Sequence, residues 1–215
     1  MTVTTHPLRN SIQQGDCIEV MRQMPAGSVD FILTDPPYLV RYKSRDGRSI
    51  ANDDNAAWLA PAAREMYRVL KNDSLCVSFY GWTQTDRFIS AWRAAGFRIV
   101  GHIVFRKGYA SRARFVSYTH ESAYVLAKGR PVLPDNPPAD VIDFPYSGNR
   151  LHPTQKPVAA LTPLIEAFCP EGGLVLDPFC GSGSTLVAAC DANCDYLGIE
   201  LDHTYHGIAA RRLAA

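Results

Sequence analysis

Apolar strand-like runs alternate with helix-like periodicity along most of the chain, and this alternation limits the possible folds more than any other feature. Strand patterns occupy residues 29–34, 75–80, 173–176 and 196–200, and a further strand is expected to end near Gly15. Helical patterns occupy residues 17–24, 58–70, 84–95, 157–168, 184–192 and 203–213. Strands that alternate with helices predict an α/β fold, with a doubly wound, mostly parallel sheet and helices on both faces.

Two further strand patterns, at residues 97–105 and 122–126, follow one another without a helix between them. They predict one antiparallel strand pair, joined through a basic loop, in a sheet of seven strands. Residues 129–150 contain five prolines, so we expect no regular element there. In doubly wound sheets, ligands bind beyond the carboxyl ends of the strands.

The composition fits one domain over residues 1–215. The chain has 215 residues, 47% of them hydrophobic, which is enough for one sizeable core. It contains no apolar stretch of about 18 residues and its first residues do not resemble a secretory leader, so we expect a cytoplasmic protein without membrane contact. The cysteines lie mostly in apolar runs and are expected to be reduced. No metal is expected, because the finger-type spacing is not met by Cys190, Cys194, His203 and His206.

Two segments concentrate positive charge although the net charge is only +1. Residues 41–48 carry four cations and one acid, and residues 106–114 carry four cations and no acid. Both segments interleave the cations with tyrosine, glycine and serine, a pattern typical of loops that contact phosphates. We expect DNA contacts from Arg41, Lys43, Arg45, Arg48, Arg106, Lys107, Arg112 and Arg114. A solvated surface is the alternative for either segment alone.

The segment from Asp177 to Thr185, with the sequence DPFCGSGST, runs from an apolar strand through a glycine-rich turn into a helix. Gly181 and Gly183 lack a Cβ, so the backbone can bend sharply and approach a ligand closely. The segment matches neither a phosphate loop nor the dinucleotide fingerprint. Asp177 would repel a pyrophosphate but suits the ammonium of a methionine moiety, so a sulfonium cofactor fits better than a dinucleotide.

Glu200 ends the next strand, roughly 20 residues beyond the glycines, where an acid can accept both ribose hydroxyl groups. The alternative role, an acid at a helix N-terminus, fits Asp202 better than Glu200.

The segment Asp35-Pro36-Pro37-Tyr38 follows the apolar strand at residues 29–34 and suits the methylation of an amine. An exocyclic amine of a base is a poor nucleophile, because its lone pair is delocalised into the ring. Asp35 offers a carboxylate and Pro36 a main-chain carbonyl that can accept the two N–H groups and stabilise the charge that develops on nitrogen. Pro37 stiffens the turn, and the Tyr38 ring can stack on the base. Alone, this segment could equally be a turn that ends a strand.

Together with His152-Pro153-Thr154-Gln155-Lys156-Pro157, these motifs resemble those of the DNA amino-methyltransferases, specifically their circularly permuted beta class. The resemblance spans nearly the whole chain. It implies a permuted class I fold, S-adenosyl-L-methionine as methyl donor, and Asp35, Pro36, Pro37 and Tyr38 as catalytic residues. The cofactor-binding residues it implies are Asp16, Cys17, Asp35, His152, Thr154, Gln155, Lys156, Asp177, Pro178, Phe179, Gly181, Ser182, Gly183, Ser184, Glu200 and Leu201. For Asp16, contact with the cofactor adenine and an N-cap role are weighed equally.

The same resemblance implies a substrate and partners. Asp in the first motif position goes mainly with N6 of adenine in duplex DNA, reached by base flipping. N4 of cytosine or an RNA target is the alternative. A hypothesis from a different class of protein is a DNA-binding regulator without catalytic activity. A short recognition insertion is expected at about residues 108–150. A homodimer and a cognate restriction endonuclease are the further partners that such relatives have, and nothing in the chain's own pattern establishes either.

Overall fold

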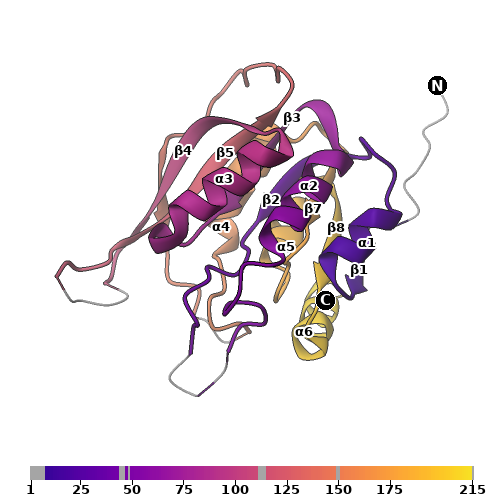
Figure 1. Ribbon diagram of the computed structural model, residues 1–215. Coiled ribbons are helices and arrows are strands. Elements are labelled where there is room, and N and C mark those ends of the chain that lie inside the picture. Colours follow the sequence, from indigo (N-terminus) through magenta and orange to yellow (C-terminus); the bar gives the residue numbers. More distant parts are fainter. Residues whose placement is uncertain (1–7, 44–46, 48, 111–114, 149–150, 215) are drawn as a thin grey trace.

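The computed structural model describes residues 8–43, 47, 49–110, 115–148 and 151–214. Within these residues the chain forms one twisted sheet with helices on both faces (Figure 1). The eight strands lie in the order β1-β8-β7-β2-β3-β5-β4-β6.

The elements follow the expected alternation. The strands are β1 (Ser11–Gln14), β2 (Val29–Thr34), β3 (Leu70–Phe79), β4 (Arg98–Lys107), β5 (His120–Lys128), β6 (Val141–Phe144), β7 (Leu174–Asp177) and β8 (Asp195–Glu200). The helices are α1 (Cys17–Gln23), α2 (Leu59–Val69), α3 (Thr85–Ala95), α4 (Val158–Phe168), α5 (Ser184–Asp191) and α6 (His203–Leu213). A short 3₁₀ turn, Trp82–Gln84, precedes α3.

The sheet is parallel except at β5, which runs antiparallel to both β3 and β4. The register pairs Gln14 with Glu200 and Asp177 with Gly198, so the carboxyl ends of β1, β8 and β7 lie at one edge. The end of β2 joins them through its pairing with β7. The expected fold class is confirmed, and the residues that follow these four strands face a common space.

One strand was not expected. Val141–Phe144 forms β6, which pairs in parallel with β4 at the end of the sheet, inside the proline-rich stretch predicted to have no regular element. The run VIDF contains no proline, and a strand at the edge of a sheet needs hydrogen bonds on only one side. The sheet in the described residues therefore has eight strands, one more than expected. Elsewhere in that stretch, the amide of Arg130 donates to Asp73 near the start of β3, at the edge opposite the motifs.

Two apolar clusters hold the helices to the sheet. Helices α1, α2 and α3 cover one face, and the largest buried side chain there is Trp92. Helices α4 and α5 cover the other face, where Phe31, Phe79 and Phe105 are buried. All six residues of β2 are buried, because helices cover both of its faces. This explains why the sequence of β2 is a nearly continuous apolar run.

Helix caps fix the points where the chain leaves the sheet. Asp16 follows β1 and caps α1, and Asp202 follows β8 and caps α6, each through side-chain oxygens that accept amide hydrogens of the first turn. Gly96 ends α3 with a φ of 108°, as the sequence predicts for a left-handed C-cap. None of the helices in the described ranges is long and apolar enough to cross a membrane.

Candidate active site

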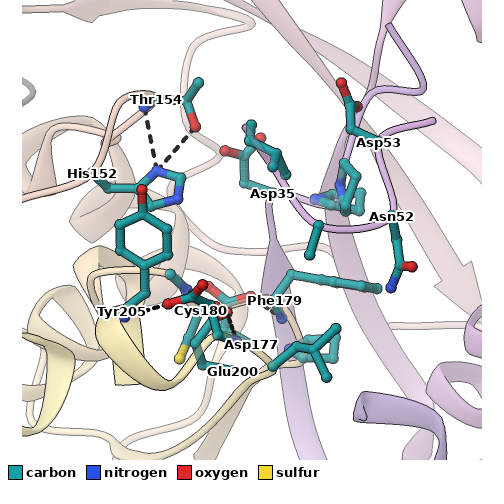
Figure 2. Close-up of a pocket in the computed structure, with 18 of the residues that line it drawn as sticks. Asp35, Asn52, Asp53, His152, Thr154, Asp177, Phe179, Cys180, Glu200 and Tyr205 are labelled. Carbon is teal, nitrogen blue, oxygen red and sulfur yellow. Dashed lines mark hydrogen bonds between the residues drawn. The ribbon is translucent and has the colours of Figure 1, made fainter. Parts of the chain in front are cut away.

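A pocket lies at the carboxyl edge of the sheet, where β1, β8, β7 and β2 end. Its walls come from the turns after these four strands, from the loop that leads to α2, and from the segment before α4. Figure 2 shows side chains from these segments around a shared space, with His152 and Tyr205 on one side and Asn52 and Asp53 on the other. Segments far apart in the chain thus form one site.

Nearly all the residues predicted to form the site line this pocket. Those expected to bind the cofactor or the amine are Asp16, Cys17, Asp35, Pro36, Pro37, Tyr38, His152, Thr154, Gln155, Lys156, Asp177, Pro178, Phe179, Gly181, Ser182, Ser184, Glu200 and Leu201. Gly183 is not among the lining residues. It has a φ of 80°, and a Cβ there would lie 3.2 Å from the Cβ of Ala209 in α6. Gly183 therefore permits close packing of two helices.

The glycine turn and Glu200 are joined by hydrogen bonds. One carboxylate oxygen of Glu200 accepts the amide of Gly181 at 2.8 Å, and the other accepts the amide of Asp202 at 2.7 Å. Burial raises the pKa of Glu200, and these amide hydrogen bonds oppose the rise. Each oxygen keeps a second lone pair, so the carboxylate can accept further hydroxyl groups.

Asp177 ends β7 and is only 2% exposed. Its Oδ1 accepts the Thr34 hydroxyl at 2.8 Å and the Phe179 amide at 3.1 Å, which ties the ends of β7 and β2 together. Burial raises the pKa of Asp177 to about 7, although hydrogen bonds from Thr185 and Thr34 oppose the rise. A buried carboxylate with a raised pKa gains most from a cationic partner, because a positive charge restores the ionised form.

Asp35, directly after β2, lies within a set of polar contacts. The Tyr38 hydroxyl donates to its Oδ1 at 2.7 Å, and the Lys156 ammonium lies 2.7 Å from its Oδ2. Burial raises the pKa of Asp35, the positive charge of Lys156 opposes this, and the negative charge of Glu121 adds to it. Burial raises the pKa of Tyr38 far above its usual range, and the negative charges of Asp35 and Glu121 raise it further. Tyr38 therefore keeps its proton and remains a hydrogen-bond donor.

Asp53, which the sequence analysis did not single out, orders the loop after the Asp35 motif. It is 2% exposed, and its carboxylate accepts the amides of Leu39 at 2.7 Å and Tyr42 at 2.6 Å. The indole of Trp58 donates to the carbonyl of Asn52, so this loop forms a wall of the pocket. Asp53 lies in the polar run NDDN, in which no local pattern distinguishes it.

Glu121, at the start of β5, was also missed. It forms ion pairs with Lys107 at 2.5 Å and with Lys156 at 2.9 Å. Its position after the basic loop gives no sequence signal, because only the pairing of β4 and β5 brings it to the site.

The cations expected to contact DNA divide into three groups. Arg41, Lys43 and Arg106 are exposed, and Arg106 forms an exposed ion pair with Asp143. Lys107 has a side chain that is only 7% exposed and is paired with Glu121, a position unlike that of a phosphate contact. Arg45, Arg48, Arg112 and Arg114 lie outside the described residues.

A stacked aromatic pair, the exposed Trp82 and the partly buried Tyr118, lies near the site. Trp82 is 66% exposed and stacks on Tyr118, with ring centroids 5.9 Å apart and planes inclined by 24°. It follows β3 by way of Gly81, whose Cα region contacts the Tyr38 backbone. An exposed tryptophan beside a pocket is a typical feature of a binding surface.

Comparison with known proteins identifies the family. A family model described as a DNA methylase of the N6/N4 type matches residues 29–149 and 143–211. These matches cover most of the chain, so the protein belongs to this family of DNA methylases. In Escherichia coli (strain K12), YubD, a protein named as a methylase, is 59% identical over 94% of this chain and 89% of its own. YhdJ of the same strain, named as a DNA adenine methyltransferase, is 31% identical over 94% of this chain and 82% of its own.

Solved structures share the fold. The complex of M1.HpyAVI with S-adenosylmethionine has a TM-score of 0.76 at 22% identity, over 95% of this chain and 98% of that one. PvuII DNA methyltransferase, named as cytosine-N4-specific, has a TM-score of 0.79 at 18% identity, over 97% of this chain and 89% of that one. The family that the motifs resemble and the class I fold are thereby confirmed.

The contact between Gly81 and Tyr38 yields a first prediction. A Cβ at Gly81 would lie 2.5 Å from the Tyr38 carbonyl oxygen, so Gly81→Ala must displace the turn that carries Asp35. We expect a loss of about 1–3 kcal/mol in the free energy of unfolding, measured by denaturant titration, and reduced methyl transfer. Gly108→Ala is the matched control, because no atom lies within 4 Å of the added Cβ. Equal stability of the two variants would contradict the assigned contact.

Proposed function

We propose that the protein transfers a methyl group from S-adenosyl-L-methionine to N6 of adenine in duplex DNA. The observation that carries this proposal is that a single pocket contains both the Asp35 motif after β2 and the glycine turn with Glu200 after β7 and β8. A site for an amine and a site for a nucleoside-bearing donor are therefore adjacent. Membership of the N6/N4 DNA methylase family supports the same reaction class.

The residues of the pocket fit the donor. The free lone pairs of Glu200 suit ribose hydroxyl groups, and the buried carboxylate of Asp177 suits the ammonium of the methionine moiety. The rings of Phe179 and Trp58, with centroids 5.0 Å apart, supply an apolar wall. When bound, S-adenosylmethionine supplies a methyl group on a sulfonium centre, which makes that methyl strongly electrophilic.

The Asp35 motif suits the acceptor amine. An ionised Asp35 accepts one N–H of the amine, and the main-chain carbonyl of Pro36 is the proposed acceptor for the other. Both acceptors leave the nitrogen lone pair free to attack and stabilise the positive charge that develops on nitrogen. The proton can leave after the methyl group has arrived, so no strong base is required.

The target amine lies inside the duplex, so the base must be extruded into the pocket. Arg41, Lys43 and Arg106 are exposed cations in the segments that flank the site and are the proposed phosphate contacts. The stacked pair of Trp82 and Tyr118 offers a face for a base beside the extruded one.

Adenine is the proposed base because the first residue of the motif is Asp35 and because YhdJ carries the name of a DNA adenine methyltransferase. Cytosine N4 is the second candidate, because the PvuII enzyme shares the same fold. The two products differ as nucleosides and are separable by chromatography.

The main prediction concerns the reaction itself. Incubation of the protein with isotope-labelled donor and unmethylated genomic DNA should yield labelled N6-methyl-2′-deoxyadenosine after digestion to nucleosides. Asp35→Ala removes one of two acceptors and should lower the rate on the order of 10²–10³-fold. Donor affinity, measured by calorimetry, should change little.

Labelled N4-methyl-2′-deoxycytidine as the product would contradict adenine as the target base and favour cytosine. Tight DNA binding without any methyl transfer would favour the regulator instead, and full activity in Asp35→Ala would remove the proposed role of that residue.

The raised pKa of Asp177 gives a pH dependence. The donor ammonium favours the carboxylate, so donor binding must release a proton where free Asp177 is protonated, which is below about pH 7. We expect the dissociation constant to rise toward about tenfold per pH unit below that point. Calorimetry in buffers of different ionisation enthalpy should report the released proton. Asp177→Asn should bind more weakly and lack this acid limb, and an unchanged limb would exclude Asp177 as its origin.

The stacked pair of Trp82 and Tyr118 yields a further prediction. Trp82→Ala should weaken binding of a duplex by about 1–3 kcal/mol, which is typical of one lost base stack. Fluorescence anisotropy with a labelled duplex measures this change, and donor affinity should be unaffected. Val100→Ala removes another exposed apolar side chain, near the start of β4 and outside the expected recognition insertion, and serves as control. Equal DNA affinity of both variants would exclude stacking by Trp82.

A further inference from the structure

Four charged side chains of alternating sign form a chain that ends at Asp35. Lys107 lies 2.5 Å from Glu121, Glu121 lies 2.9 Å from Lys156, and Lys156 lies 2.7 Å from Asp35. The four residues come from the end of β4, the start of β5, the segment before α4 and the turn after β2. The fold therefore assembles this group from four separate parts of the sequence.

The group is buried and electrically balanced. The side chains of Lys107 and Lys156 are 7% and 6% exposed, and those of Asp35 and Glu121 are mostly covered. Two positive charges face two negative charges, so no member is an unpaired buried charge, which would be strongly destabilising. Burial alone would raise the pKa of Glu121, but Lys156 and Lys107 outweigh it and lower that pKa to about 2.

The position of Lys156 determines what Asp35 can do. Its ammonium is shared between the Asp35 and Glu121 carboxylates, and it also donates to the Tyr38 hydroxyl at 3.2 Å. Without this cation, a buried Asp35 would protonate and become a weaker acceptor for an N–H of the amine. With the cation held by Asp35 alone, the carboxylate would be more fully neutralised and a weaker acceptor.

We propose that Glu121 is a positioning residue for methyl transfer. It shares the Lys156 ammonium with Asp35, so that Asp35, which Lys156 keeps ionised, is not fully neutralised and still accepts the target amine. Lys107 holds Glu121 in place for this role. The inference rests on the proposed function, because it assumes that Asp35 binds the amine. It adds two residues, Glu121 and Lys107, that the sequence analysis did not place in the reaction.

The expected pH dependence follows from the groups around Asp35. These are Lys156, Glu121 and Tyr38, with Asp177 at the end of β7 and Lys107 behind Glu121. Asp35 accepts more strongly when ionised and then also stabilises the positive charge that develops on nitrogen, so the rate of the chemical step should rise with pH through its pKa. Lys156 lowers this pKa and Glu121 raises it. Removal of the Lys156 charge alone and removal of the Glu121 charge alone must therefore shift the acid limb, the low-pH part of the pH–rate profile, in opposite directions.

The test is the single-turnover rate of methyl transfer against pH, at saturating donor and DNA, for the whole chain. Lys156→Met should move the acid limb to higher pH by about one unit or more. Glu121→Gln should move it to lower pH. Its plateau rate should fall about tenfold, less than the loss on the order of 10²–10³-fold for an acceptor removed outright. Glu121→Asp should restore part of that rate.

Controls separate this role from a structural one. Lys71→Gln breaks an ion pair with Asp30 at the opposite edge of the sheet and should leave the pH profile unchanged. Donor affinity of Glu121→Gln should stay within about twofold of the original, a difference below ~0.5 kcal/mol. If Glu121→Gln fails to fold, Lys107→Gln tests the same role. Glu121, having lost Lys107, should then attract Lys156 more strongly and draw it away from Asp35, so the acid limb should move to higher pH.

The inference would be overturned if Lys156→Met and Glu121→Gln shifted the acid limb in the same direction, or if neither variant shifted it. A Lys156→Met variant that loses donor affinity but keeps the original pH profile would also overturn it, because Lys156 would then serve the donor and not Asp35. Absence of methyl transfer by the unaltered protein is a different result, because it would refute the proposed function itself.

Discussion

The ion pair between Asp35 and Lys156 joins the two halves of the site. Asp35 follows β2 in the first part of the chain, and Lys156 precedes α4 in the second, yet the ammonium lies 2.7 Å from the carboxylate. A buried carboxylate needs such a partner to stay ionised, and a buried ammonium needs a carboxylate for the same reason. In the proposed reaction, therefore, neither half of the chain supplies the acceptor for the amine without the other.

The sheet makes this contact possible. Parallel strands end at one edge of the sheet, so the turns after β1, β8, β7 and β2 meet there. The strand order alone brings them together, and the loop sequences need not specify it. The hydrogen bond from Thr34 to Asp177 fixes the end of β2, next to the proposed amine site, against the end of β7, next to the proposed donor site. Apolar clusters on both faces hold the four strands in this register. The fold thus sets the separation between the two proposed binding sites.

Sequence reasoning found the parts of the site that have local signals. The prolines after Asp35, the glycine turn after Asp177 and the acid at the end of β8 each follow an apolar run. The structure brings the prolines, Gly181 and Glu200 to one pocket, whereas Gly183 packs against α6. Glu121 and Asp53 could not be found in this way, because their partners are distant in sequence and meet them only after folding. Lys107 was predicted to contact DNA because it lies in a basic segment, although its side chain is mostly buried and paired with Glu121. The strand β6 was missed because prolines flank it and a short edge strand has little periodicity.

The central claim is that an ionised Asp35 accepts an N–H from the amine of an extruded adenine, while Asp35 and Glu121 share the Lys156 ammonium. A crystal structure with a duplex and an unreactive analogue of the donor tests it directly. The amine nitrogen should lie within hydrogen-bonding distance of the Asp35 carboxylate, with Lys156 still between Asp35 and Glu121. An adenine that remains stacked, an amine remote from Asp35, or a Lys156 that has moved to the carboxylate of the donor would contradict the claim.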